Sequence, residues 1–396
     1  MTDALPALAD LTTMRVGGMP ARIVTPRTED DLISAVRTVW EDGDPWLLLG
    51  GGSNTIASDD GFDGTVIRVV TRGIQRLDTG MPGEPVRLRV QAGEPWDTLV
   101  ATIVANGWAG VEALSGIPGS TGAAPVQNIG AYGQELSSHL TGIDFLDATT
   151  GHVRRMDAAD LDLGYRSSVL KTSSVRRGLE GVVLSVELEL PPNETEPGAP
   201  MSEPILYAQL ANALGVDLGA RVSLAELRRT VLALRASKGM VLDPDDPDSV
   251  SAGSFFTNPI VSGQFAATLP TDAPRWPVAS DEPDLVAPLD AASAEQSASV
   301  SLIADAARER GRRQGRRSTD VKLSAAWLIE HAGIRRSFAL PGSRAAISSK
   351  HTLALTNRGG ATAADVVELA RYVQGRVQAE FGVVLQPEPV LVGVSL

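Results

Sequence analysis

The sequence predicts an α+β protein of two or three domains whose first third is rich in β-strands. The chain has 396 residues, which is more than one small domain needs to bury a core. Short runs that alternate apolar and polar side chains, as strands do, are interleaved with segments of helical periodicity. Apolar residues make up 43% and charged residues 21% of the chain, as in ordinary soluble globular proteins.

A helix is the first element that the pattern predicts. Within "RTEDDLISAVRTVWEDG", Thr28 can cap the helix because Asp31 stands three residues later, as in a capping box. The apolar stripe that follows is Leu32, Val36 and Val39. Next, "PWLLLGGGSN" predicts a short buried strand that runs into a glycine-rich turn.

Strands and a second helix complete the region up to about residue 110. The segments 65–70 and 86–93 alternate as strands do. "WDTLVATIVANG" predicts an amphipathic helix that ends at Asn106-Gly107, because glycine readily adopts the backbone conformation that closes a helix.

Residues 110–135 form an unusual stretch that is saturated with Gly, Ala, Ser and Asn. It is too long and too apolar for a linker, and too rich in glycine for a regular helix or a central strand. After it, "DFLDATTGHVRRMD" predicts a hairpin and "GVVLSVELELPP" an alternating strand. We place the end of this region near Pro192.

The second half is predicted to consist mainly of helices and connections. A polar connection at 194–204 precedes a helix at 222–239. A long helix begins after Thr362 and is stopped by Gly382. The chain then finishes as a strand that is interrupted by Pro387-Glu388-Pro389.

Residues 262–320 change in character. They are rich in Pro, Ala, Ser and Asp and then contain "RERGRRQGRR", with six arginines. We interpret this segment as a solvated, mobile insertion, and the alternative is a site for phosphate or a partner.

The lack of cysteine and the scarcity of histidine limit which side chains could act in catalysis or bind a metal. The chain contains no cysteine, which excludes disulfides, thiolate nucleophiles and cysteine-ligated metals. Its four histidines are far apart and no H-E-x-x-H motif occurs, so we predict no metal site. Acid–base work would then fall mainly on Asp, Glu, Lys, Tyr or an unusual Ser. The net charge of −13 argues against a nucleic-acid partner but allows a local basic pocket for a small anion.

The sequence predicts a cytoplasmic protein. The first residues lack a basic start followed by a long apolar run, so we expect no signal peptide. No apolar stretch reaches about 18 residues, so we expect no membrane partner. We also expect the protein to be a monomer.

Glycine is clustered where a ligand could approach the backbone. The Rossmann, P-loop and nucleophile-elbow motifs are all absent. Instead, glycines gather at Gly17-Gly18, at 50–54 and at 116–133, and their bare N–H groups could close around phosphate. Three such sites suggest a large phosphorylated cofactor, and ordinary turns are the alternative.

Ser254 in "SAGSFFTNP" is the most distinctive hydroxyl. A serine is a poor nucleophile without a base, and the nearest histidine along the chain is His331. Its hydroxyl could instead donate a proton to a much stronger base, such as an enolate carbon. We expect the adjacent Phe255 and Phe256 to be buried anchors for this loop.

An enolate would need positive charge nearby. Arg166, Arg235 and Lys238 are the candidates, although the residues alone favour an ordinary surface charge for each. Glu388 stands between two prolines, which gives its carboxylate a rigid backbone, and its alternative is an exposed strand end.

Four features carry a resemblance to a known family. The glycine-rich stretches, "YRSSVLK", "GSFFTNP" and "QPEPVLVG" occur in an order that resembles the UDP-N-acetylenolpyruvoylglucosamine reductase (UDP-N-acetylmuramate dehydrogenase) family. The resemblance runs from about Leu11 to Gly393. "GIPGSTGAAPVQNIGAYGQE" together with "GSFFTNP" is highly specific.

The resemblance implies an FAD-binding fold of the vanillyl-alcohol-oxidase (PCMH-like) type, with two α+β subdomains and a C-terminal α+β substrate-binding domain. It implies an FAD-binding region at 11–192, with subdomains at about 11–72 and 73–192. A connecting segment and helix at 193–238 would lead to a substrate-binding domain at 239–361, which contains the insertion at 262–320. A C-terminal helix and strand at 362–396 would pack back toward the active site.

The resemblance also implies a reaction. NADPH would reduce a non-covalently bound FAD, and the reduced flavin would pass a hydride to the enolpyruvyl group of UDP-N-acetylglucosamine enolpyruvate. Protonation of the resulting enolate by Ser254 would give UDP-N-acetylmuramate, a peptidoglycan precursor. Because flavin supplies the redox chemistry, the absence of metal and thiol groups is no obstacle.

Site residues carry over from the matching motifs. The catalytic residues implied are Arg166 for the enolpyruvyl carboxylate, Ser254 as proton donor and Glu388 for the enolic intermediate. Those implied for FAD are Gly50, Gly51, Gly52, Ser53, Asn54, Ser115, Gly116, Ile117, Pro118, Gly119, Ser120, Gly122, Asn128, Gly130, Ala131 and Tyr132. Those implied for substrate are Tyr207, Arg235, Lys238 and Asn258.

Two points depart from this picture or compete with it. The family often opens with Asn-Thr-Phe, whereas this chain has Thr12-Thr13-Met14.

The competing hypotheses are another FAD-dependent oxidoreductase of the same fold that acts on a sugar or alcohol, and a non-enzymatic nucleotide-binding protein. Such oxidases commonly tether flavin through His or Cys, and this chain has no Cys and no His before His139.

Overall fold

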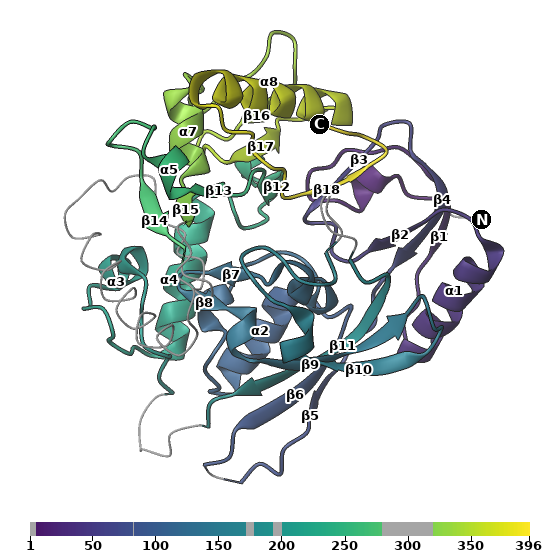
Figure 1. Cartoon of the computed structure of the whole chain (residues 1–396). Helices are drawn as coiled ribbons and strands as arrows, with labels where there is room; N and C mark the ends of the chain where they lie inside the picture. Colours follow the sequence, from purple (N-terminus) through teal and green to yellow (C-terminus); the bar gives the residue numbers. More distant parts are fainter. Residues whose placement is uncertain (1–4, 82, 172–177, 193–199, 279–319) are drawn as a thin grey trace.

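The computed structural model describes residues 5–81, 83–171, 178–192, 200–278 and 320–396 (Figure 1). Its first sheet is parallel, with strand order β1 (Pro20–Val24), β4 (Phe62–Arg68) and β2 (Trp46–Leu49). Helix α1 (Glu29–Asp42) begins as predicted, because Thr28 accepts a 3.1 Å hydrogen bond from the N–H of Asp31. Its predicted stripe is buried against strands of this sheet and the next one.

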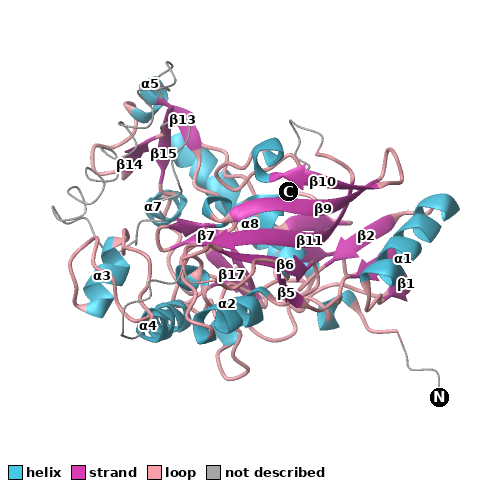
Figure 2. Cartoon of the chain, turned by 90° about the horizontal axis from the view of Figure 1, so that it is seen from below, coloured by secondary structure: helices cyan, strands magenta, loops and turns pink. Residues whose placement is uncertain are grey.

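The second sheet is the largest and is antiparallel throughout. Its strand order is β10 (Val153–Asp157), β9 (Leu140–Asp147), β11 (Gly181–Leu190), β6 (Val86–Gln91) and β5 (Ile74–Arg76). The predicted hairpin, formed by β9 and β10, is confirmed. Figure 2 shows this sheet in the middle of the molecule, between α1 on one side and α3 and α4 on the other.

The two faces of the large sheet differ. Alternate residues on one face, such as Leu88 and Val186, share a core with α2 (Trp96–Ala105), α3 (Ala208–Leu214) and α4 (Leu224–Ser237). The helices of the expected connecting segment therefore pack into the core of this sheet.

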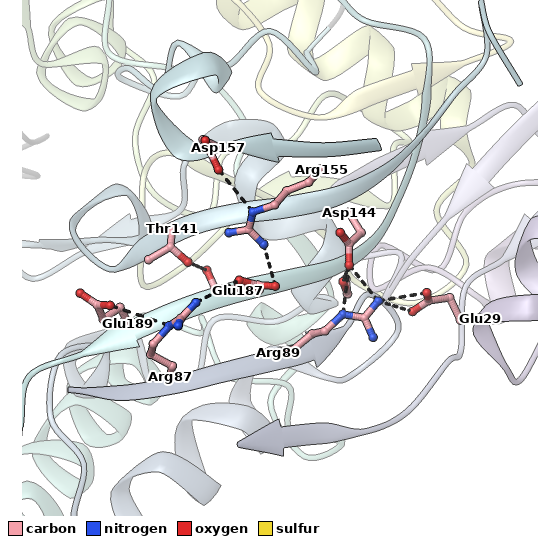
Figure 3. Close-up of polar contacts among 10 residues, drawn as sticks. Glu29, Arg87, Arg89, Thr141, Asp144, Arg155, Asp157, Glu187 and Glu189 are labelled. Carbon is pink, nitrogen blue, oxygen red and sulfur yellow. Dashed lines mark hydrogen bonds and ion pairs between the residues drawn. The ribbon is translucent and has the colours of Figure 1, made fainter. Parts of the chain in front are cut away.

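Charged side chains form a ladder on the opposite face of the sheet, as Figure 3 shows. Arg155 pairs with Glu187 at 2.6 Å, and Arg89 lies between Asp144 and Glu29 at 2.8 and 3.0 Å. Because these charges are satisfied within the ladder and remain partly solvated, we read this face as structural.

The glycine-rich stretch contains no long regular element, as predicted. It forms 3₁₀ turns at Glu112–Leu114 and Thr121–Gln127 and a small hairpin of β7 (Gly130–Ala131) and β8 (Gln134–Glu135). The 3₁₀ turn at Thr121–Gln127 packs against β11 on the apolar face of the large sheet.

The C-terminal part builds its own core. A sheet of β12 (Ser251–Ser254), β17 (Ala354–Asn357) and β16 (Ala345–Ile347) packs against α8 (Ala363–Phe381), which Thr362 caps and Gly382 ends as predicted. Helix α7 (Ala325–His331) joins the same core.

The segment expected to be a mobile insertion is ordered at its beginning. Strands β13 (Ile260–Ser262), β15 (Asp320–Leu323) and β14 (Arg275–Pro277) form a sheet, with α5 (Gly263–Ala266) beside it. The mobile interpretation is therefore wrong for 263–277, where apolar residues such as Ala266 and Leu269 enter the C-terminal core. The arginine-rich stretch lies outside the described residues.

The end of the chain returns to the first subdomain. Strand β18 (Val390–Val392) pairs in parallel with β3 (Thr55–Ala57), where yellow meets purple in Figure 1. The carboxylate of Asp59 also accepts hydrogen bonds of 2.9 and 3.2 Å from the first N–H groups of α8. These contacts join the C-terminal core to the first subdomain.

In the part of the chain that the structure describes, none of the helices combines the length and the apolar character that crossing a bilayer requires.

Candidate active site

A cavity of about 410 Å³ lies where the first parallel sheet, the large sheet, strand β12 and the returning chain end meet. One wall is formed by residues 50–55, and a second by residues 117–120, 122–124, 126, 127, 129 and 130. Phe145 and Val183 of the large sheet form an apolar surface within it. The C-terminal part contributes residues 251–254 and Glu388.

The two glycine-rich loops pack directly on each other. A Cβ atom on Gly51 would lie 2.7 Å from the Cα of Gly119, which no real side chain tolerates. Ser53 fixes the same contact by donating a 3.0 Å hydrogen bond to the Pro118 carbonyl. These glycines are therefore required for loop–loop packing, and that packing presents the backbone of both loops to the cavity.

Most residues expected to bind FAD line this cavity. Those that do are Gly50, Gly51, Gly52, Ser53, Asn54, Ile117, Pro118, Gly119, Ser120, Gly122 and Gly130. Ser115, Gly116, Asn128, Ala131 and Tyr132 are not among the described lining residues.

Three of these five residues support the loop from behind. The Ser115 hydroxyl donates to the Glu112 carbonyl at 2.6 Å, and the Gly116 N–H donates to the Asp97 carboxylate at 2.6 Å. Asn128 accepts a 3.0 Å hydrogen bond from the N–H of Ser137. These bonds turn their polar groups toward protein partners.

The three predicted catalytic residues come together at the cavity although they are far apart in sequence. Arg166, Ser254 and Glu388 all line it. The Arg166 Nε lies 3.3 Å from Glu388 Oε1, and the two side chains are only 20% and 14% exposed. The readings of Arg166 as a surface charge and of Glu388 as an exposed strand end are therefore wrong.

The peptide of Glu388 is held from two domains. Its N–H donates to the Phe255 carbonyl at 2.8 Å, next to Ser254. Its carbonyl accepts from the side-chain amides of Asn54 and Gln127 at 3.3 and 3.2 Å. The sequence analysis does not identify Gln127 as a site residue, because no local pattern distinguishes its partly buried amide from one exposed to solvent.

Ser254 is the last residue of β12, and two buried rings anchor the chain that follows it. Phe255 and Phe256 are 0% and 1% exposed, with ring centroids 5.1 Å apart in an edge-on arrangement. The Phe255 N–H also donates to the Leu353 carbonyl at 2.8 Å. The expectation that this pair anchors the loop is confirmed.

Arg235 is a buried cation with an unsatisfied donor at the cavity. It lines the cavity and is 9% exposed, so its reading as a surface charge is wrong. Its Nη2 donates to the Met240 carbonyl at 3.1 Å, whereas its buried Nε has no hydrogen-bond partner among the described residues. Burial lowers the pKa of Arg235. An anionic ligand group would offset this cost.

Several cations lie in the surroundings of Arg235. Burial, together with the charges of Lys238, Arg336 and Arg235, lowers the pKa of His351 to about 3. A neutral imidazole beside several cations indicates a local field that favours a bound anion.

The other predicted substrate residues lie behind the cavity wall. The Tyr207 ring is 5% exposed and packs edge-on against Tyr132, with centroids 5.6 Å apart. Lys238 Nζ lies 5.8 Å from the centroid of the same Tyr132 ring and donates to Gln209 Oε1 at 2.9 Å. The amide oxygen of Asn258 accepts from the N–H of Ala325, at the start of α7.

The cavity therefore fits a long, phosphorylated cofactor with an apolar ring system. It offers glycine-rich backbone, an apolar surface and a buried guanidinium whose Nε is unpaired. Among the described residues, no three His, Asp or Glu side chains are grouped to hold a metal ion.

Comparisons with known proteins agree with these features. Residues 20–157 match the model of an FAD binding domain, and residues 245–392 match that of the C-terminal domain of UDP-N-acetylenolpyruvoylglucosamine reductase. The UDP-N-acetylenolpyruvoylglucosamine reductase of Leifsonia xyli subsp. xyli is 63% identical over 398 aligned residues, covering 100% of both chains. That of Salinispora arenicola is 45% identical, covering 100% of this chain and 96% of the relative.

A solved structure shows the same fold. The crystal structure of the enzyme of the same name from Thermus caldophilus superposes with a TM-score of 0.58 at 23% identity, over 98% of this chain and 97% of that one. The mixed α+β architecture and the FAD-binding-domain match confirm the predicted fold class.

Proposed function

Because the chain belongs to the UDP-N-acetylenolpyruvoylglucosamine reductase family, we propose how its own residues carry out the reaction of that family. The protein is an FAD-dependent oxidoreductase that uses NADPH as co-substrate. It reduces UDP-N-acetylglucosamine enolpyruvate in peptidoglycan precursor synthesis. The observation that carries the residue-level proposal is the convergence of Arg166, Ser254 and Glu388 on one cavity.

FAD fits along the two packed glycine loops. When bound, it accepts reducing equivalents from NADPH and delivers them to the enolpyruvyl group. The residues that would hold it are those of 50–54 and 117–122, with Gly130 at the end of the same wall. Phe145 and Val183 would exclude water from its apolar ring.

Arg166 would bind the substrate carboxylate. Reduction of the double bond places negative charge next to that carboxylate, and a fixed guanidinium stabilises it with paired hydrogen bonds. Glu388 is bonded to the Nε edge of Arg166 and would hold the guanidinium plane in place. Its carboxyl group also lines the cavity, where we propose that it helps to stabilise the enolic intermediate.

Ser254 would supply the proton. A hydroxyl is too weak an acid for most acceptors, but an enolate carbon is a sufficiently strong base. The ring anchors and the β12 pairing hold its backbone, so little reorganisation is needed when the acceptor forms.

The remaining substrate residues are assigned by their position. We propose that Arg235 contacts an anionic group directly, because its Nε is unpaired at the cavity. Lys238 and Tyr207, which pack around Tyr132, would border the diphosphate. Asn258 would act by fixing the start of α7.

We also propose that the protein works as a monomer in the cytoplasm. Residues of a single chain supply both the expected cofactor loops and the catalytic group.

One assay tests the function. The purified protein should carry a yellow flavin, and its NADPH oxidation should depend on UDP-N-acetylglucosamine enolpyruvate. Colourless protein with no gain of activity on added FAD would contradict the flavoenzyme reading. Oxidation of NADPH at the same rate without the sugar nucleotide would contradict the substrate.

Replacing Arg235 by methionine tests the role of the buried cation. Methionine has similar length and removes the desolvation cost, so we expect the ligand-free protein to keep or raise its melting temperature. Binding of the anionic ligands should weaken, because the unpaired Nε is lost. Thermal unfolding and equilibrium binding of FAD and substrate check this. Unchanged affinity for both ligands would show that Arg235 is only structural.

A further inference from the structure

Arg166 occupies an unusual backbone conformation. Its φ is +49°, in the left-handed region that residues with a Cβ enter only when their surroundings hold them there. This conformation lies at the residue that we assign to the substrate carboxylate. A hydrogen bond made to the Arg166 peptide itself therefore bears on the reaction.

The loop around Arg166 is held by several hydrogen bonds. Gly164 and Ser167 exchange backbone bonds of 3.1 and 3.2 Å across it. The Ser168 hydroxyl donates to the Val126 carbonyl at 2.8 Å, which ties the loop to the second cavity wall. Lys171 Nζ donates to the carbonyl of Arg166 itself, at 3.2 Å.

Lys171 also carries charge close to the catalytic pair. Burial lowers the pKa of Lys171, the carboxylate of Glu388 opposes this shift, and Arg166 adds to it. The ammonium thus interacts with both members of the Arg166–Glu388 pair. It is not among the described residues that line the cavity, so it acts on the substrate through that pair.

We propose that Lys171 is a positioning residue for the reduction step. Its hydrogen bond to the Arg166 carbonyl holds the left-handed backbone of that residue, and its ammonium adds positive charge beside the Arg166–Glu388 pair. One cation and one carboxylate alone would present a nearly neutral pair to the substrate carboxylate. Lys171 behind them, in addition to Arg235 on the cavity wall, supplies net positive charge where negative charge develops. This proposal rests on the function proposed above.

The two half-reactions separate this role from a merely structural one. Lys171→Met removes the charge and the donor, and we expect it to lower the rate of enolpyruvyl reduction by about 10- to 100-fold. Reduction of the bound flavin by NADPH should keep its wild-type rate, because no negative charge develops beside a substrate carboxylate in that step. Lys171→Arg keeps the charge and a donor and should restore most of the activity. Lys171→Gln keeps a donor without charge and should remain impaired.

Ser168→Ala is the matched control. It loosens the same loop, at the Ser168–Val126 bond, without altering the charge near Glu388. We expect a lower melting temperature and near-wild-type kcat.

Three results would overturn the proposal: wild-type turnover by both Lys171→Met and Lys171→Gln, no recovery in Lys171→Arg, or the same selective loss in Ser168→Ala. Failure of the wild-type protein to reduce the sugar nucleotide would instead overturn the proposed function.

Discussion

Ser254→Ala is expected to reduce its flavin with NADPH at the wild-type rate and to form product at least about 100-fold more slowly. The substitution removes one oxygen and leaves the backbone of β12 unchanged. Phe255 and Phe256 anchor the chain through buried rings, so the fold should not change. Rapid-mixing kinetics of the two half-reactions, with product analysis, measure both effects.

Two companion variants sharpen this test. Ser254→Cys keeps an ionisable proton at the same place and should recover part of the activity. Ser262→Ala removes the hydroxyl that caps α5, away from the cavity lining, and should turn over like wild type. Normal product formation by Ser254→Ala would mean that another group, or water, supplies the proton.

Arg166→Gln is expected to lower kcat/KM for the sugar nucleotide by about 100- to 1,000-fold, because the charge that stabilises the enolate is lost. Flavin reduction by NADPH should be little affected. Steady-state kinetics in both substrates check this. A rise in KM with unchanged kcat would show instead that Arg166 binds the ground state and the transition state equally.

A double-mutant cycle with Glu388→Gln tests whether the two residues act together. The peptide of Glu388 keeps its bonds to Phe255, Asn54 and Gln127 in this variant, so only the carboxylate is changed. Because the side chains are 3.3 Å apart and both line the cavity, the two effects should be strongly non-additive. Additive losses would mean that the two residues act independently.

Local elements of the fold were predictable because their signals are local. The start of α1 and both ends of α8 follow from capping residues and glycine at the expected positions. The β9–β10 hairpin follows from alternation around a turn. In each case the hydrogen bonds that define the element join residues close in sequence.

The early part of 262–320 departs from the predicted solvated insertion for the opposite reason. Its composition is that of a solvated segment, yet β14 pairs with β15, a strand more than 40 residues further along the chain. Pairing with a distant strand leaves no periodic signal in so short a segment. Similarly, Arg235 follows an apolar stripe on α4, and nothing in the helix indicates that the arginine is more deeply buried than Leu234.

The sequence by itself determined the fold class and the family, and through the family the set of residues that we propose to be catalytic. Those conclusions depend on residue types, periods and motifs, which are properties of the linear chain. Only the tertiary structure decided which of these residues meet. It shows that the side-chain amides of Asn54 and Gln127 donate to the Glu388 carbonyl, and that Arg235 lines the cavity with an Nε that has no partner among the described residues. The physical reason is that burial and long-range hydrogen bonds arise when distant segments exclude water together.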